Sequence, residues 1–279
     1  MLKFYTTKSK KTERVTVVIP LFNAHLFDLT LEGLCRQTCD DFKIVIVNDG
    51  GYDFDDLIRK YSQRLNLEYY YLFSPRDLYS VVGARNLGIH CTKTNRVIFL
   101  DNDCVPSKTF IEENLKYSDN DKRIVAGVRF RIRQSDQHKI TNINDLSQLC
   151  HEKDDRYLTH PQWRKERLKH ILEMEKGEKA FPLYCHGFCV NYLTDDLKSI
   201  GGFSKSLEGF SEEDQDLAIR LCKTEGYATI LDKNICSYHL DHSTSDIARS
   251  ETELKNTIKK SNPVRNKGKL IWYNYERRI

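Results

Sequence analysis

The stretch RVIFLDNDCVP, residues 96–106, joins an apolar run to a cluster of acids. Four of its first five residues are apolar, which is typical of a buried strand. Asp101, Asn102 and Asp103 follow directly, and Pro106 prevents much further strand. Acids at such a point either form a turn or supply oxygen ligands to a divalent cation. The motif alone is compatible with both interpretations, and the surrounding sequence has to distinguish them.

The first 130 residues alternate strand-like runs with helix-like segments. The strand-like runs are short and rich in β-branched or aromatic residues, and they cover 15–20, 42–47, 67–72 and 96–100. The segments between them carry apolar residues near helical spacing, and they cover 26–36, 54–64 and 81–90. This alternation predicts an α/β protein with a Rossmann-like, mostly parallel central sheet flanked by helices. Ligands bind beyond the carboxyl ends of such strands, where Asp101, Asp103 and the NDGG stretch at 48–51 fall.

The composition is that of an ordinary folded protein. The 279 residues are 39% hydrophobic and 30% charged, and the formal net charge of +4 is too small to indicate nucleic-acid binding. Nine cysteines occur without a CxxC pair, which argues against a structural zinc site and favours reduced thiols. The sequence contains neither a secretory signal nor the run of ~18 apolar residues that spans a bilayer, so we expect a cytoplasmic protein.

We expect one domain with four consecutive segments: 1–132, 133–180, 181–245 and 246–279. The second segment is dense in charge and histidine, and its helical pattern at 143–153 and 161–176 predicts a helical insertion. The third segment returns to strand-like sequence, and its expected elements are strands within 181–192, 227–231 and 235–240 and a helix at 213–225. The fourth segment is a basic and mostly polar tail.

The helix expected at 213–225 begins with an unusual concentration of acids. In GFSEEDQDLAIRL, residues 209–221, Glu212, Glu213 and Asp214 crowd the first helical turn. The positive end of the helix dipole favours anions there, and an acidic cap explains one or two of them. Three acids beside the aromatic Phe210 exceed what a cap requires. A carboxylate in this place is suited to act as a general base.

A histidine pair follows the last expected strand, in YHLDHS at residues 238–243. Neutral imidazole is a common metal ligand, so His239 or His242 is a candidate to complete a site built on aspartate. The alternative is a surface or structural role.

An arginine stands near the start of a predicted helix, in GARNLGI at residues 83–89. The planar guanidinium of Arg85 suits a phosphate group, and it equally suits a surface ion pair.

Together and in this order, these motifs resemble the family 2 glycosyltransferases with a GT-A fold. The segments that carry the resemblance are VVIPLFN (17–23), IVIVNDGG (44–51), GARNLGI (83–89), VIFLDNDCVP (97–106) and SIGGFSKSLEGFSEEDQDLAIRL (199–221). The last of them, with YHLDH behind it, also resembles a galactosyltransferase-type C-terminal region. The resemblance spans roughly 15–132 and 181–243. Each motif is weak alone, but five in register are a strong signal.

The resemblance implies a division of labour among the segments. Residues 1–132 would be the nucleotide-sugar-binding half, 133–180 an insertion on the acceptor side, and 181–245 the catalytic and acceptor half. Uridine would be lined by Pro20, Phe22 and Asn23, with Asp49 at the uracil edge. Asp101 or Asn102 would meet the ribose or a metal-bound water, and Arg85 is assigned to donor phosphate.

The resemblance also implies a metal site and a base. Asp103 would ligate Mn²⁺ or Mg²⁺, with His239 completing the site and His242 as the second choice. Asp214 would be the catalytic base, and Glu213 would hydrogen-bond the donor or acceptor sugar. The implied reaction is inverting transfer of a hexose or N-acetylhexosamine from a UDP-sugar to a hydroxyl of a glycan or glycolipid. Cell-surface polysaccharide synthesis is the expected setting.

Some residues depart from the family pattern. Asn48 replaces the more usual Asp, Cys189 stands where Asn is expected, and Phe210 is nearest to the usual Trp before the Glu-Asp pair. Two other functions remain open: a sugar-phosphate nucleotidyltransferase and a non-catalytic nucleotide-sugar-binding module. The first normally has a glycine-rich loop after its first strand, and PLFNAH at 20–25 contains no glycine.

The basic tail at 246–279 has two interpretations. It is either a solvated terminus or a peripheral contact with anionic lipid, which would suit a lipid-linked acceptor. We expect no nucleic-acid partner.

Overall fold

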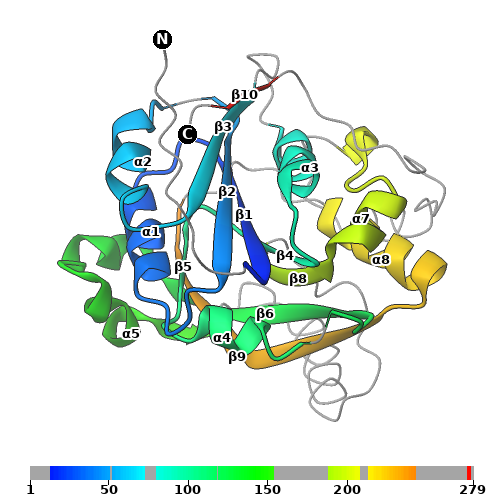
Figure 1. Ribbon diagram of the computed structural model, residues 1–279. Helices are drawn as coiled ribbons and strands as arrows, with labels where there is room; N and C mark the ends of the chain where they lie inside the picture. The colour runs from blue at the N-terminus through cyan, green and yellow to red at the C-terminus, as the bar shows by residue number, and fades with distance from the viewer. Residues whose placement is uncertain are drawn as a thin grey trace.

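The computed structural model of the protein describes residues 13–50, 52–72, 80–117, 119–153, 188–207, 213–242 and 275–277, with the backbone alone at 151–153 and 275–277. Phe210, Glu212, the helix predicted at 161–176 and most of the basic tail lie outside the described residues. The described elements form a mixed α/β fold around one ten-stranded sheet (Figure 1).

Four parallel strands form the N-terminal half of the sheet, in the order β3-β2-β1-β4. Their bounds are β1 Val15–Leu21, β2 Phe42–Asn48, β3 Leu67–Leu72 and β4 Arg96–Leu100. All seven residues of β1 and all five of β4 are buried, which is typical of parallel strands covered on both faces. This half matches the Rossmann-like prediction, and its strand bounds agree with the sequence to within one residue.

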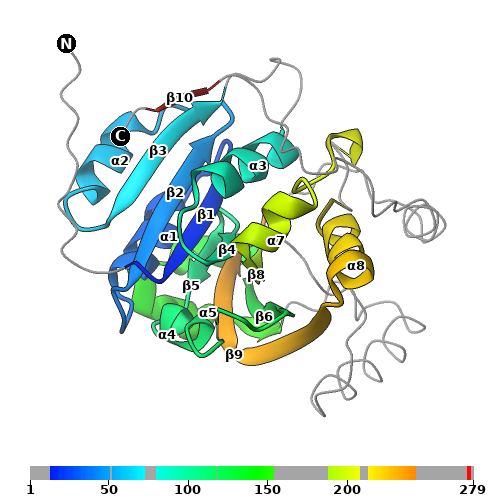
Figure 2. The ribbon, with the colours of Figure 1, turned by 45° about the vertical axis from the view of Figure 1, so that its right-hand side comes forward.

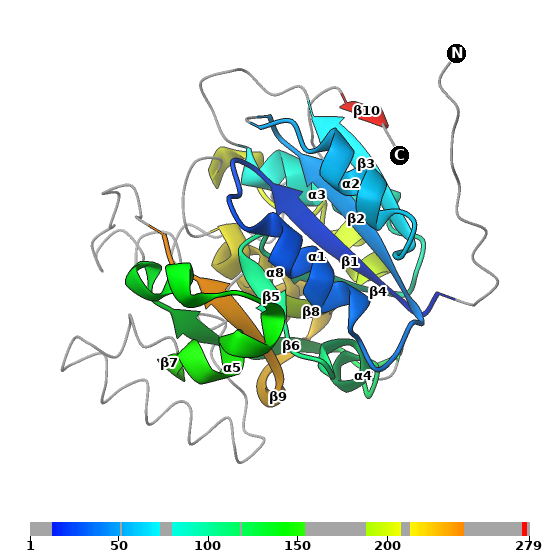
Figure 3. The ribbon, with the colours of Figure 1, turned by 90° about the vertical axis from the view of Figure 1, so that its left-hand side faces the viewer.

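Helices cover both faces of these strands. The helices that connect the strands are α1 (Phe27–Cys35), α2 (Asp55–Tyr61) and α3 (Val81–Cys91). One buried cluster joins the strands to α1 and α2, and a second joins them to α3 and to α7 (Thr194–Ser199) and α8 (Glu213–Glu225). Figures 2 and 3 show α1 and α2 on one side of the sheet and α3, α7 and α8 on the other.

The C-terminal half of the sheet is mixed. Its strands are β5 (Cys104–Pro106), β6 (Arg123–Ile132), β7 (His151–Lys153), β8 (Cys189–Leu193) and β9 (Ala228–Leu240). β8 pairs antiparallel with both β4 and β6, β6 runs parallel to β9, and β5 runs antiparallel to β9. The sheet also gains β7 beside β6 and β10 (Tyr275–Arg277) beside β3, both antiparallel. The parallel character expected of the sheet therefore belongs to its first half and to the β6–β9 pair.

Several details differ from the sequence-based expectation, and the short strands β5 and β10 are among the elements that were not predicted. β6 was not predicted, and the two strands expected near 227–231 and 235–240 form the single strand β9. The helix expected at 143–153 is shorter: it consists of η2 (Ile143–Asp145) and α5 (Leu146–Leu149), and 151–153 form β7 instead. The other short helices are α4 (Phe110–Asn114), η1 (Gln134–Lys139) and η4 (Lys205–Leu207).

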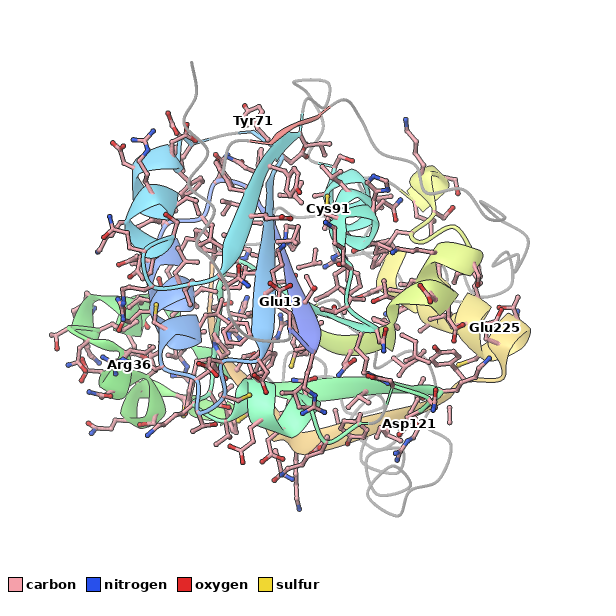
Figure 4. All side chains as sticks on the ribbon, in the orientation of Figure 1. Glu13, Arg36, Tyr71, Cys91, Asp121 and Glu225 are labelled. Carbon is pink, nitrogen blue, oxygen red and sulfur yellow. The ribbon has the colours of Figure 1, made fainter. Side chains whose placement is uncertain are left out.

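Charged groups occupy two kinds of environment in this fold. The ion pairs of Arg36, Asp121 and Glu225 lie at the margin of the molecule (Figure 4), where such pairs stabilise a protein by about 1 kcal/mol or less. Arg220 and Asp216 instead form an ion pair with no exposed surface on α8. Arg220 also donates to the carbonyls of Ile200 and Gly202, so the middle of α8 is held against the turn that follows α7.

Within the described part of the chain, none of the helices is both long and apolar enough to cross a bilayer.

Candidate active site

The Asp-X-Asp turn lies where β4 passes into β5. The Cys104 N–H donates to the Asp101 carbonyl at 3.1 Å and closes the turn. Asn102 is held from two sides, because its carbonyl accepts from the Thr30 hydroxyl at 2.9 Å and its amide donates to the Phe22 carbonyl at 3.4 Å. The two acids face different partners from this turn: Asp101 pairs with Arg85, and Asp103 pairs with His239 and His242.

Asp103 faces two histidines. Its Oδ2 lies 3.2 Å from Nε2 of His239 and 3.0 Å from Nε2 of His242. The sheet creates this contact, because Cys104 of β5 is the register partner of His239 on β9 and the Leu240 N–H donates to the Asp103 carbonyl at 2.9 Å. The structure therefore brings together three residues that the sequence selected as metal ligands.

The three side chains suit a divalent cation. Their ligand atoms lie within 4.8 Å of one another. Burial opposes ionisation of the Asp103 carboxyl, but hydrogen bonds with His239 and His242 outweigh burial and lower its pKa well below the usual range. The carboxyl is therefore in the charged form that a metal requires. Two of the three ligand atoms are imidazole nitrogens, which suit transition-metal ions better than Mg²⁺, since Mg²⁺ prefers oxygen ligands.

An unpredicted residue, Asp241, fixes the segment that carries the two histidines. Its carboxylate pairs with Arg131 of β6, and its N–H donates to the Ile132 carbonyl at 3.0 Å. The Gln137 amide donates to the Asp241 carbonyl at 2.6 Å. Asp241 appeared in the sequence only as the residue between two candidate ligands, and no local signal identified Arg131 as its partner.

Arg85 of α3 joins the Asp-X-Asp turn to the start of α8. Its Nη2 lies 3.1 Å from Oδ1 of Asp101, and its Nη1 lies 2.8 Å from Oε1 of Glu213. Arg85 is only 4% exposed, so it does not make the surface ion pair considered from the sequence. Burial raises the pKa of the Glu213 carboxyl, and the nearby Arg85 guanidinium partly offsets this effect.

Asp214, the predicted base, is buried in the first turn of α8. Its Oδ1 accepts from the Gln215 N–H at 2.7 Å. Glu213 precedes it, and within the described part of the chain the buried Oε2 of Glu213 has no hydrogen-bond partner. The helix thus has two adjacent buried carboxylates in its first turn, and one oxygen of Glu213 lacks a hydrogen-bond partner among the described residues.

The predicted uridine-binding residues lie at the ends of β1 and β2. Pro20 is buried within β1, while Asn23 follows in an exposed loop with φ of +45°. Oδ1 of Asn23 accepts from the Tyr52 N–H at 3.1 Å, so it connects the loops after β1 and β2. The carboxylate of Asp49 accepts from the Ser80 N–H at the start of α3. Tyr52, which the sequence did not indicate as a site residue, lies in the loop after β2 and is half exposed.

The replacement of Asp by Asn48 has a physical reason. Asn48 is fully buried, and its amide donates to the Tyr69 hydroxyl at 2.8 Å and to the Tyr52 carbonyl at 3.3 Å. Its side-chain oxygen accepts from the Gly50 N–H at 3.1 Å. An ionised carboxylate only accepts hydrogen bonds, so it would leave the Tyr52 carbonyl without this donor.

The fold and these residues first define a class. The Rossmann-like sheet with the Asp-X-Asp turn at a strand end is that of the glycosyltransferases with a GT-A fold, and solved structures of this class have the same fold. The sequence profile of Glycosyl transferase family 2 matches residues 16–192, so the chain belongs to that family. This membership confirms the resemblance and favours glycosyl transfer over nucleotidyl transfer. The galactosyltransferase-type character of the C-terminal region stays a prediction.

Individual relatives are distant in sequence. The chain is 26% identical over 242 residues to the chondroitin synthase of Escherichia coli, covering 80% of this chain but only 34% of that protein. The mannosyltransferase PcManGT of Pyrobaculum calidifontis, solved with GDP-Man and Mn²⁺, has a TM-score of 0.58 at 18% identity, covering 86% of this chain and 59% of its own. TarS 1-349 of S. aureus with UDP-GlcNAc has a TM-score of 0.59 at 15% identity, covering 88% and 64%. These structures establish the fold alone.

Proposed function

We propose that the chain is a metal-dependent, inverting hexosyltransferase. It moves a hexose or N-acetylhexosamine from a UDP-sugar to a hydroxyl of a glycan or glycolipid. The observation that carries this proposal is the convergence of Asp103, His239 and His242 beyond the end of β4. Asp101 of the same turn is linked to Glu213 at the start of α8 through Arg85. The match to a chondroitin synthase, of which the chain spans about one third, supports a role in polysaccharide synthesis.

The donor nucleotide binds at the carboxyl ends of β1 and β2. Pro20, Phe22 and Asn23 line the uridine, and Asp49 accepts a hydrogen bond from the uracil edge. Asp101 or Asn102 meets the ribose hydroxyls. The support for this assignment is the rule that ligands of parallel α/β sheets bind beyond the carboxyl ends of the strands.

Asp103 with His239, and with His242 as the alternative, holds Mn²⁺ or Mg²⁺. A divalent ion at these residues neutralises charge that develops on the diphosphate leaving group. In the metal-free protein, hydrogen bonds with the two imidazoles keep the pKa of Asp103 low, so the carboxylate is already ionised before a cation binds.

Asp214 acts as the general base and removes the proton from the acceptor hydroxyl. The deprotonated acceptor oxygen forms a bond to the anomeric carbon from the face opposite UDP, and the bond from that carbon to UDP breaks in the same step, so an α-linked donor gives a β-linked product. Glu213 accepts a hydrogen bond from the donor or acceptor sugar through its available Oε2. No covalent enzyme intermediate is required.

The test is a screen of UDP-sugars with Mn²⁺ that measures UDP release in the presence and absence of glycan acceptors. Asp103→Ala should lose metal-dependent donor binding. Asp214→Asn should keep donor binding and lose transfer by about 10²–10⁴-fold, the usual contribution of a general base. Normal transfer by Asp214→Asn would refute the base assignment, and retained anomeric configuration would refute the mechanism. A protein that binds UDP but never releases it from a donor would be a binding module.

Two further parts of the chain concern the acceptor. We propose that the segment 133–180 shapes acceptor choice and that the basic tail contacts anionic lipid. Co-sedimentation with anionic liposomes at low salt, with full-length and tail-truncated protein, tests the tail. Equal and negligible binding by both proteins would exclude the lipid contact.

A further inference from the structure

Arg85 is surrounded by groups from three separate parts of the fold. Its guanidinium hydrogen-bonds Asp101 after β4 and Glu213 at the start of α8, at 3.1 and 2.8 Å. Its central carbon lies 5.3 Å from the ring centre of Phe203. A buried arginine with two carboxylates and an aromatic ring has its position fixed on several sides.

The neighbouring residue on α3, Asn86, fixes the aromatic partner. The Asn86 amide donates to the Phe203 carbonyl at 3.0 Å, and its side-chain oxygen accepts from the Phe203 N–H at 2.8 Å. Asn86 and Phe203 are both almost completely buried. One turn of α3 therefore holds the ring against the guanidinium and holds the guanidinium against both carboxylates.

The chemistry of the guanidinium explains why this position needs arginine. Its planar fork presents separate N–H groups to Asp101 and Glu213 at the same time. The ammonium of a lysine is a single point charge and does not reproduce the fork. Each terminal nitrogen of Arg85 has a carboxylate partner and the residue is 4% exposed, and this burial disfavours a direct contact with the donor diphosphate.

We propose that Arg85 is a positioning residue that aligns Glu213 and the first turn of α8 with the Asp-X-Asp turn. The inference rests on the proposed function and replaces the assignment of Arg85 to donor phosphate. Through this link Glu213 and Asp214 keep a fixed distance from the Asp-X-Asp turn, which carries the carboxylates expected to meet the donor. A displacement of about 1 Å at reacting groups costs roughly 100-fold in rate.

The test compares Arg85→Lys with the wild type in two assays. Calorimetric titration of UDP in the presence of Mn²⁺ gives the donor affinity, and UDP release with acceptor gives kcat. A positioning role predicts a Kd for UDP within about twofold of wild type and a kcat lower by about 10- to 100-fold. Arg59→Lys is the matched control, because Arg59 is exposed on α2 and pairs there with Asp56.

A second variant separates positioning from general loss of structure. If Arg85 acts through Glu213, then adding Arg85→Lys to Glu213→Gln should lower kcat little further, because each change alone already breaks the Arg85–Glu213 ion pair. If Arg85→Lys fails to fold, the same double variant is compared with Glu213→Gln alone, since the neutral amide no longer needs a cationic partner.

The outcomes decide between the roles. A weaker Kd for UDP in Arg85→Lys would overturn the proposal in favour of phosphate binding, and unchanged Kd and kcat would overturn both roles. Fully additive losses in the double variant would overturn the link through Glu213. A wild-type protein that transfers no sugar would contradict the proposed function instead, and the UDP titration would still decide whether Arg85 binds phosphate.

Discussion

The two candidate histidine ligands should contribute unequally to metal affinity. His239 belongs to β9 and its side chain is 3% exposed, whereas His242 follows the strand and its side chain is 58% exposed. Replacement of each by Gln removes the imidazole and keeps a polar side chain beside Asp103. We expect His239→Gln to weaken Mn²⁺ binding more than His242→Gln.

The expected difference follows from the order of the two side chains before the metal binds. Fixing one exposed side chain costs about 0.5–1.5 kcal/mol, and His239 is already fixed by packing. Since tenfold in Kd corresponds to about 1.4 kcal/mol, the loss of His239 should weaken Mn²⁺ binding by about 2- to 12-fold more in Kd than the loss of His242.

Isothermal titration of Mn²⁺ into the metal-free proteins measures this difference. His138→Gln is the control, because His138 is exposed on η1 and lies outside the metal cluster. Thermal melts in EDTA should show whether either variant has lost the fold. An equal or reversed order of the two losses would refute the reasoning from side-chain order, and unchanged Mn²⁺ binding in both variants would refute the site.

Two further predictions concern stability. A Cβ at Gly88 would lie 2.2 Å from Cγ1 of Val18, so Gly88→Ala should lower the free energy of unfolding by about 1–3 kcal/mol in urea titrations, and an unchanged midpoint would contradict the packing described here. Burial raises the pKa of Glu213 above its ordinary 4.5, so the folded protein binds this proton more tightly than the unfolded chain. Stability should therefore fall as pH rises from about 4.5 through the folded pKa. Glu213→Gln should flatten urea-derived stability across that window, and an identical slope in both proteins would count against the burial effect.

The N-terminal half of the fold could be predicted closely because its signals are local. Residues 67–72 and 96–100 match β3 and β4 over their full lengths. β6 escaped prediction because Gly127 and three arginines interrupt its apolar pattern. Tertiary packing requires that glycine, since a Cβ there would lie 2.3 Å from Sγ of Cys189.

The candidate site likewise has a part that could be predicted from local sequence and a part that depends on contacts between distant residues. The position of the Asp-X-Asp turn follows from a topological rule that needs only the order of strands and helices. The partners of Arg85 could not be read in advance, because Glu213 is 128 residues away in sequence and both groups look like surface charges in isolation. Asp241 was missed for the same reason, since its role depends on Arg131 of a strand that was not predicted.

The pairing of β5 with β9 has a consequence for biosynthesis. The segment that contains the four parallel strands and Asp103 emerges from the ribosome before His239 and His242 have been synthesised. Since synthesis proceeds from the N-terminus, a nascent chain that stops before β9 has the carboxylate but lacks both imidazoles. The long-range β5–β9 contact also forms slowly, because the intervening chain must first be closed into a loop. The candidate metal centre is thus assembled only after β9 has left the ribosome and joined the sheet, and prematurely terminated chains cannot form it.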